Sequence, residues 1–355
     1  MDKILILREK IEALDKEIAK LFEDRMKIVK EIALYKSKNN LEICDSKREE
    51  ALLEKNSVYI KETEFLNYYK KFLIDLMNTS KEYQRDLLDQ RLIAYQGVKG
   101  AFSYLASKEL FKHSKLNSYD TFEEVFLAVE SKKVDFGVLP IENTFTGEIT
   151  EVLDLLFKYN LYITQIYDLH IDQNLVGIKG TKITDILEVY SHPQAILQSQ
   201  IFLKARDFKV IEYPNTALAA KHVSEAKDKT KAAIASIDTA MLYDLDVICE
   251  KINTSDKNKT RFIVISKELP KDGNCYSVIF TTEDKVGALA SIIQEIAKLG
   301  FSMDKIISRP TKDKEWGYYF YVELRGSINN KTLDDLKDTL KNKVKIIKVV
   351  GSYYK

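Results

Sequence analysis

The sequence has little cysteine and little histidine, and neither residue forms a ligand-binding pattern. Its three cysteines, Cys44, Cys249 and Cys275, are far apart, odd in number and without a CxxC pair, which favours a reducing compartment over a disulfide framework. The four histidines form no HExxH motif. We therefore expect no metal site and no cofactor.

The sequence also lacks an excess of either charge and any long apolar run. It has 55 basic and 54 acidic residues, so its net charge of +1 gives no electrostatic reason to bind nucleic acid or an anionic membrane. The first residues place charges on both sides of a very short apolar stretch, which is not typical of a signal peptide, and no apolar run could span a bilayer. We expect a cytoplasmic protein.

Glycine and proline are missing from the first 88 residues, which predicts an all-helical domain over 1–88. Residues 91–268 alternate β-rich runs with amphipathic helices and predict an α/β domain. A linker is expected at 269–274. A third domain over 274–355 has the order strand, helix, strand, strand, helix, strand, which fits a ferredoxin-like βαββαβ fold.

Two cations interrupt an apolar seam in the helical domain. The seam recurs every three or four residues at Leu7, Ile11, Leu14, Ile18, Leu21, Ile28, Ile32 and Tyr35. Arg25 stands where this pattern requires an apolar residue, and Lys36, eleven residues later, shares its face. A guanidinium in a packed seam is costly without an anion. The pair predicts a dianionic ligand, although a buried ion pair with a carboxylate of the chain explains Arg25 equally well.

Further polar residues follow at helical spacing. Asp45 is a natural helix N-cap, with Arg48 and Glu49 on the same face, and Ser80 and Gln84 form an i,i+4 pair. Taken alone, the first group is most simply a solvated first turn with an ion pair. Its meaning depends on the other polar positions of the domain.

Together, eight positions resemble, in order and spacing, the active site of all-helical chorismate mutases: Arg8, Arg25, Lys36, Asp45, Arg48, Glu49, Ser80 and Gln84. The resemblance implies that Arg8, Arg25 and Arg48 hold the two carboxylates of chorismate. It implies that Lys36 and Gln84 donate to the breaking ether oxygen and that Glu49 receives the substrate hydroxyl. Asp45 and Ser80 would hold the site in shape. In this family the first arginine comes from a partner subunit, so we expect a homodimer or a higher homo-oligomer.

The α/β domain carries short polar runs at the ends of predicted elements: 95–103, 140–144, 190–194, 215–217 and 260–262. The run at 140–144 follows a buried strand, and open α/β folds bind ligands at the carboxyl ends of their strands. Pro193 suits the first position of a helix capped by Ser191 or His192, where free N–H groups can receive a carboxylate. Each run alone is also explained as a cap or a turn. The glycines at 97 and 100 do not form GxGxxG, which disfavours a dinucleotide site.

These runs resemble prephenate dehydratases along essentially the whole domain. The resemblance implies two α/β subdomains with a cleft between them, similar to periplasmic small-solute-binding proteins. It implies Thr260 as the essential hydrogen-bond donor, with Glu142 as its partner. Asn143, Ser191 and Gln198 are implied as substrate contacts. Arg261 is an anion contact or a brace for Thr260.

The last domain resembles an ACT domain, a sensor of amino acids. In dehydratases its phenylalanine site has a Gly-Ala-Leu-Val run and a Glu-Ser-Arg-Pro run. Here the sequence has Gly287-Ala-Leu-Ala290 and Ile307-Ser-Arg-Pro310. The resemblance implies a phenylalanine site at Gly287, Ala288, Leu289, Ser308, Arg309 and Pro310. Ile307 and Ala290 depart from the family pattern, so the affinity for phenylalanine is expected to differ, and a domain used only for subunit contacts is the alternative.

The sequence thus predicts a bifunctional enzyme, an isomerase and lyase, that converts chorismate through prephenate to phenylpyruvate under feedback inhibition by phenylalanine. A mutase joined to a prephenate dehydrogenase is disfavoured because the dinucleotide motif is missing. A non-catalytic amino-acid or small-solute sensor is the alternative from another class. The presence of Arg25, Lys36, Arg48 and Thr260 argues against it, since a sensor has no need of them.

Overall fold

The computed structural model describes residues 3–39, 41, 46–88, 91–255, 257–283, 285–311, 317–327 and 332–355. The chain divides into two compact units, Met1–Gln90 with Phe111–Ser114, and Arg91–Leu110 with Lys115–Lys355. Across the described ranges, no helix combines the length and the apolar character that crossing a membrane requires.

The first unit is helical, as the sequence predicts. It contains α1 (Lys3–Lys38), α2 (Ser46–Ser57), a short 3₁₀ turn η1 (Thr63–Phe65) and α3 (Leu66–Leu88). Val29 and Ala33 of α1 pack into its small core with Leu73 and Met77 of α3. These buried positions lie one residue after Ile28 and Ile32 of the predicted seam.

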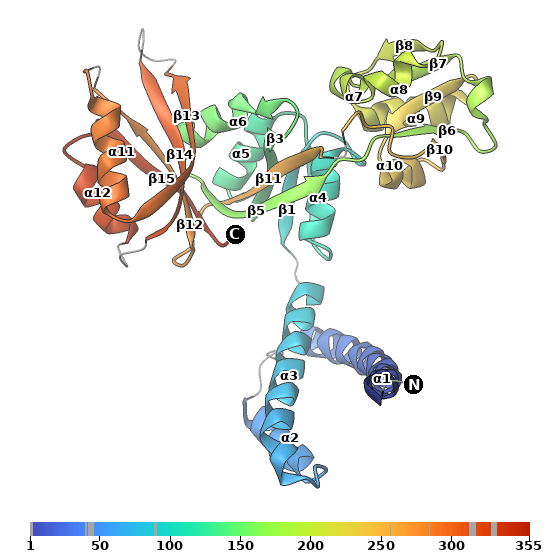
Figure 1. Ribbon diagram of the computed structural model, residues 1–355, viewed down its shortest axis with the longest axis vertical. Coiled ribbons are helices and arrows are strands. Elements are labelled where there is room, and N and C mark those ends of the chain that lie inside the picture. The colour runs from blue at the N-terminus through green and yellow to red at the C-terminus, as the bar shows by residue number, and fades with distance from the viewer. Residues whose placement is uncertain are drawn as a thin grey trace. The chain divides into compact units, whose positions relative to one another are not determined.

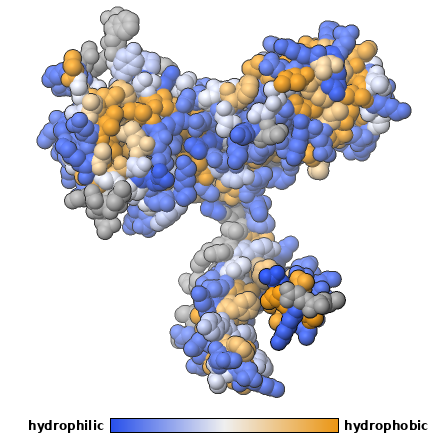
Figure 2. All heavy atoms as spheres, viewed as in Figure 1, coloured by the Kyte–Doolittle hydropathy of each residue, from blue (hydrophilic) through white to orange (hydrophobic). Residues whose placement is uncertain are grey.

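Most of the predicted seam is exposed within this single chain. Hydrophobic surface is visible on α1 in Figure 2. The exposed fractions are 46–68% for Leu7, Ile11, Leu14, Ile18 and Leu21. A row of apolar side chains at coiled-coil spacing needs a partner surface to leave water.

The second unit begins with an α/β lobe (Figure 1). Its strands run in the order β5 (Tyr162–His170), β11 (Lys259–Ser266), β3 (Phe136–Asn143), β1 (Leu92–Gln96) and β2 (Lys115–Tyr119), and the short β4 (Gly147–Glu148) pairs with β3. Its helices are α4 (Phe102–Leu110), α5 (Phe122–Glu130) and α6 (Thr150–Lys158). Thr121 caps α5 in a complete capping box with Glu124.

A second lobe is inserted between β5 and β11. Its sheet has the order β10 (Asp246–Cys249), β6 (Asn174–Gly177), β9 (Lys231–Ala235), β7 (Glu188–Ser191) and β8 (Lys209–Glu212). It carries η2 (Ile183–Asp185), α7 (Pro193–Gln198), α8 (Gln200–Lys204), α9 (Thr216–Ala226) and α10 (Ile237–Leu242). The chain therefore passes twice between the lobes, which is the arrangement of two subdomains expected from the sequence.

The C-terminal part has the predicted βαββαβ order. It comprises β12 (Cys275–Thr281), α11 (Ala288–Lys298), β13 (Phe301–Pro310), β14 (Tyr318–Ser327), α12 (Leu333–Leu340) and β15 (Ile346–Tyr353). The strands pair in the order β13-β14-β12-β15, the ferredoxin-like arrangement. Ile292 and Ile296 of α11 join Leu336 and Leu340 of α12 in a core against this sheet.

The expected linker at 269–274 does not separate this domain from the first lobe. Gly351 of β15 pairs with Ile163 of β5, which makes one continuous sheet. A Cβ at Gly351 would lie 2.8 Å from the Ile163 Cβ, so only glycine allows this approach. Tyr319 and Tyr321 of β14 also belong to the core that fills the first lobe.

Candidate active sites

A hollow of about 140 Å³ lies between the three helices of the first unit. It is lined by six of the eight residues predicted for a mutase site: Arg25, Lys36, Arg48, Glu49, Ser80 and Gln84. Apolar walls come from Val29, Ile32, Leu52 and Met77. Helical spacing predicts which residues share a face within each helix, and the resemblance to chorismate mutases predicted that the three faces form one site.

The hollow has more positive than negative side chains. Arg25 donates a hydrogen bond to the Ser80 hydroxyl, and partial burial lowers the pKa of its guanidinium. Among the described residues Arg25 forms no ion pair, so the alternative of a buried pair with a carboxylate of the chain is not observed. The hollow can therefore receive an anion.

Lys81 is a lining residue that sequence reasoning missed. Its Nζ lies 2.9 Å from Glu49 Oε2, which holds that carboxylate in place. Its position next to Ser80 forms no distinctive pattern in the sequence. The Gln84 side chain is buried; its Nε2 lies 3.3 Å from the Ser80 carbonyl, and its Oε1 has no partner among the described residues.

Two predicted mutase residues are not part of this hollow. Arg8 lies on the exposed N-terminal half of α1 and is not among the described lining residues. Asp45 lies outside the described residues.

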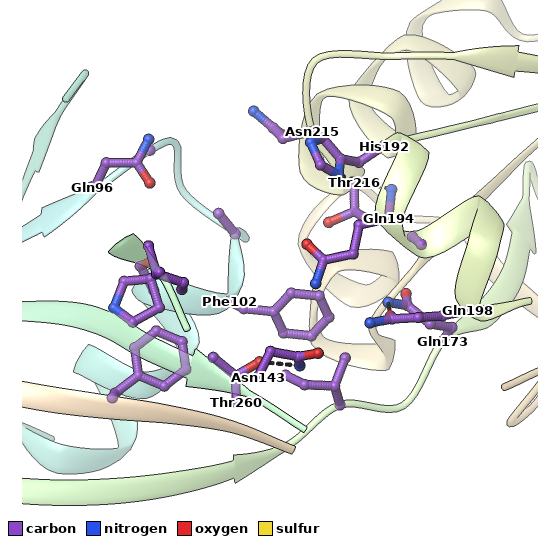
Figure 3. A pocket seen from close by; sticks show the side chains of 18 of the residues that line it. Gln96, Phe102, Asn143, Gln173, His192, Gln194, Gln198, Asn215, Thr216 and Thr260 are labelled. Atoms are coloured by element: carbon purple, nitrogen blue, oxygen red, sulfur yellow. Dashed lines mark hydrogen bonds between the residues drawn. The ribbon is translucent and has the colours of Figure 1, made fainter. Parts of the chain in front are cut away.

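A larger cavity of about 340 Å³ lies between the two α/β lobes (Figure 3). The first lobe contributes Asn143 at the end of β3 and Thr260 near the start of β11. The second lobe contributes Gln194 and Gln198 of α7, with His192 as the helix cap. This cavity is the cleft that the sequence predicts.

Asn143 is the best-anchored side chain in the cleft. Its Nδ2 lies 2.9 Å from Thr260 Oγ1 and 3.0 Å from Asn258 Oδ1. Its Oδ1 accepts hydrogen bonds from the backbone N–H groups of Phe145, at 2.9 Å, and Thr146, at 3.1 Å. Because Asn143 donates to the Thr260 oxygen, the Thr260 hydroxyl proton remains available, and no described residue accepts it.

The opposite wall carries amides that sequence reasoning did not single out, apart from Gln198. Gln173 Nε2 lies 3.0 Å from Gln198 Oε1, and the buried Gln173 Oε1 has no described partner. Gln194 Nε2 reaches across the cleft to Thr146 Oγ1 at 3.0 Å. The sequence signal for Gln194 was present in the run at 190–194, whereas Gln173 has only its place after β5.

Among the described residues that line the cleft, only His192 has a titratable side chain. Its Nδ1 accepts the Gln194 backbone N–H at 3.2 Å, and burial lowers its pKa, which favours the neutral imidazole. The starts of α4, α7 and α9 also line the cleft. Helix N-termini and side-chain amides can hold carboxylates without a lysine or an arginine.

Three predicted dehydratase residues do not line the cleft. Ser191 is fully buried, and its hydroxyl donates to the Ile234 carbonyl at 2.9 Å. Glu142 and Arg261 neighbour Asn143 and Thr260 in the sequence, but successive strand residues point to opposite faces. Both lie on the reverse face, where Glu142 Oε1 is 2.8 Å from Lys305 Nζ.

The predicted regulatory residues lie at two places in the last domain. Gly287 precedes α11 with a φ of +81°, and Ala288 and Leu289 begin that helix. Ser308, Arg309 and Pro310 end β13. Arg309 Nη2 lies 3.0 Å from Asp154 Oδ2 of α6, so this run also contacts the first lobe.

A cationic helical hollow and a neutral cleft between two α/β lobes define a multidomain enzyme with two separate candidate sites and a C-terminal ferredoxin-like domain. Three family models match the chain: Chorismate mutase type II at residues 7–85, Prephenate dehydratase at 93–270 and ACT domain at 276–337. The bifunctional chorismate mutase/prephenate dehydratase of Aquifex aeolicus (strain VF5) is 32% identical, over 100% of this chain and 99% of that protein. The chain belongs to the family of bifunctional chorismate mutase/prephenate dehydratases.

Solved structures agree with this assignment. The prephenate dehydratase of Staphylococcus aureus is 28% identical, with a TM-score of 0.65, over 74% of this chain and 99% of that one. A prephenate dehydratase of Arthrobacter aurescens in complex with L-Phe shares the fold, with a TM-score of 0.68 at 24% identity, over 74% of this chain and 90% of that one. The predicted family, fold and enzyme class are confirmed, and the sensor alternative is not favoured.

Proposed function

We propose that this chain rearranges chorismate to prephenate in the helical hollow and converts prephenate to phenylpyruvate in the cleft. The observation that carries the proposal is the convergence of six expected mutase residues on one cationic hollow, together with the Asn143–Thr260 pair in a separate cleft. The two reactions follow one another, because the product of the first is the substrate of the second.

The first reaction takes place within one molecule and needs no nucleophile and no proton transfer. The hollow accelerates it by holding the dianion compactly and by stabilising charge on the ether oxygen. Arg25 and Arg48 bind the carboxylates. Lys36 and Gln84 donate to the ether oxygen. Glu49, held by Lys81, accepts the substrate hydroxyl.

The second reaction breaks two bonds of prephenate, releasing carbon dioxide and a hydroxide that becomes water by taking a proton. The uncommitted hydroxyl of Thr260 donates to the departing oxygen, and Asn143 holds that hydroxyl in place. A cleft whose described side chains are amide, hydroxyl or apolar apart from His192 replaces water around the departing carboxylate. Gln198 and Gln173 are the amides of the opposite wall.

Glu142 and Ser191 receive supporting roles in this proposal. Glu142 lies on the reverse face, so it does not act as an acid on the substrate. Ser191 fixes the end of β7 to β9 through Ile234. Thr260 is therefore the donor that the arrangement supports best.

An intertwined homodimer is part of the proposal. The exposed seam on α1 needs a partner surface, and Arg8 lies on this same half of the helix. A second copy would cover the seam and could bring its Arg8 to the first copy's hollow. We propose domain boundaries at 1–88, 91–268 and 274–355, and a cytoplasmic location.

Phenylalanine is the proposed effector, at Gly287–Leu289 and Ser308–Pro310. The positive φ of Gly287 supports this, because it lets backbone come close to a ligand at the start of α11. The relative from Arthrobacter aurescens was solved with L-Phe.

The test is to incubate pure protein with chorismate, without added cofactor, and to separate the products by chromatography. We expect phenylpyruvate. Accumulation of prephenate alone would retain the mutase and overturn the Thr260 assignment. Unchanged chorismate would overturn both activities.

A further inference from the structure

A row of charged side chains lies directly behind the catalytic pair of the cleft. Glu142, Arg261 and Asp168 are in register across β3, β11 and β5. Arg261 Nε lies 3.0 Å from Asp168 Oδ1, and its Nη1 lies 3.4 Å from Glu142 Oε2. The proposed cleft chemistry does not use any of these three charges.

The ACT domain faces this row with two charges of its own. Lys305 of β13 and Glu323 of β14 are in register with each other. Lys305 Nζ lies 2.8 Å from Glu142 Oε1, and Glu323 Oε2 lies 3.8 Å from Arg261 Nη1. Lys305 is 17% exposed and Glu323 is 8% exposed, so water screens these contacts much less than it screens surface pairs. We call these five residues the reverse-face cluster.

The cluster is connected to the cleft through two peptide bonds. Glu142 directly precedes Asn143, and Arg261 directly follows Thr260, while Asn143 and Thr260 are themselves in register. A change in the position of Glu142 or Arg261 therefore moves the backbone that carries the 2.9 Å contact between Asn143 and Thr260. Misplacement by about 1 Å can cost about 100-fold in rate.

We propose that the ACT domain positions the catalytic pair of the dehydratase through the reverse-face cluster. Lys305, Glu142 and Arg261 are positioning residues that act on Thr260 through Asn143 and the strand backbone. This inference rests on the proposed dehydratase activity of the cleft. It gives the ACT domain a part in the reaction itself, in addition to sensing an effector.

The same strand connects the cluster to the proposed effector site. Arg309 lies four residues after Lys305 on β13, which places both side chains on the face toward the first lobe. Arg309 is fixed to Asp154 of α6, and Asp154 also accepts from the Tyr319 hydroxyl at 2.7 Å. A ligand that shifts β13 at 308–310 consequently shifts Lys305 as well.

The test compares Lys305→Met with Lys298→Met, a matched control. Lys298 lies on α11, is 69% exposed and pairs with Glu295 of the same helix. Dehydratase kcat and KM are measured with prephenate on the full chain, and mutase activity is measured on the same preparations. We expect Lys305→Met to lower dehydratase kcat about 10- to 100-fold, with KM and the mutase rate nearly unchanged. Lys305→Arg should restore most of kcat, and Lys298→Met should resemble the parent.

A double-mutant cycle separates positioning from general damage. If Lys305 acts through Glu142, then Lys305→Met should cost little more once Glu142→Gln is present. Additive losses, an unchanged kcat in Lys305→Met, or an equal loss of mutase activity would each overturn the inference. A parent protein that forms prephenate but does not consume it would instead overturn the proposed dehydratase function, and the inference with it.

Discussion

Replacing Thr260 with valine tests the proposed dehydratase chemistry most directly. Valine keeps the branched shape and the strand preference of threonine in β11, and it removes only the hydroxyl. The Asn143 Nδ2 keeps Asn258 Oδ1 and the Lys259 carbonyl as acceptors, each at 3.0 Å. We therefore expect the substitution to reduce the free energy of unfolding by only about 1 kcal/mol, the worth of one hydrogen bond.

The effect on catalysis should be much larger than the effect on stability. Removal of one donor to an oxygen that gains negative charge in the transition state costs about 100- to 1,000-fold in kcat, or about 3–4 kcal/mol. Thr260→Ser keeps the donor and should retain kcat within about 10-fold of the parent, because only the packing methyl is lost. The mutase rate should be the same in all three proteins, since Thr260 is not part of the helical hollow.

The assay follows phenylpyruvate formation from prephenate, with the mutase rate and urea unfolding measured on the same samples. A protein-free blank corrects for any reaction of prephenate without the protein. If Thr260→Val keeps kcat within threefold of the parent while folding normally, the donor to the leaving hydroxide is another group. That result would also contradict the proposed role of Asn143 in orienting the Thr260 hydroxyl.

Three further outcomes follow from individual contacts. The mutase rate should hold within about twofold between pH 7 and 9, because the Gln84 amide does not titrate; a steep fall in a pH–rate profile would exclude it as the ether-oxygen donor. Gly351→Ala should lower the free energy of unfolding, measured in urea, by about 1–3 kcal/mol, because the new Cβ would lie 2.8 Å from the Ile163 Cβ. An unchanged urea concentration at the unfolding midpoint would show that β15 and β5 can move apart at little energetic cost. Burial raises the pKa values of Tyr319, Tyr321 and Tyr353, so their contribution to stability is complete below about pH 10 and is lost above it. The loss is up to about 1.4 kcal/mol per pH unit for each tyrosine. A free energy of unfolding that does not change between pH 8 and 11 in the parent, or that falls by the same amount in Tyr353→Phe, would contradict this.

Most of the helical hollow could be predicted, because helical spacing groups residues within one helix and the resemblance to chorismate mutases relates the helices to one another. Residues that recur at helical spacing share a face, so Arg25 and Lys36 could be placed together from the sequence. Arg8 differs because its proposed target lies on another copy of the chain. Lys81 was missed because a lysine beside a serine has no distinctive pattern until Glu49 of another helix lies next to it.

The cleft was predicted less completely because its residues come from strands paired over long sequence distances. The runs at 140–144 and 260–262 were found, but their side chains divide between two faces. Asn143 and Thr260 face the cleft, whereas Glu142 and Arg261 face the ACT domain. The register between β11 and β3 skips Ile141, so Pro140 and Asn143 both line the cleft although they are three residues apart. Strict alternation along one strand reveals neither this irregularity nor which face is buried against a distant domain.

The contact between the ACT domain and the first α/β lobe changes how the replacement of the family glutamate by Ile307 is interpreted. From the sequence, isoleucine in place of the family glutamate predicts only that the affinity for phenylalanine differs. In the structure Ile307 lies between Lys305 and Arg309 on the face of β13 toward the first lobe, and it packs against the core shared by both domains. An apolar side chain there strengthens the contact between β13 and the dehydratase lobe, because it is withdrawn from water against the core that both domains share, beside its register partner Tyr321. The departure therefore favours a rigid connection between the ACT domain and the reverse-face cluster, whatever its effect on phenylalanine affinity.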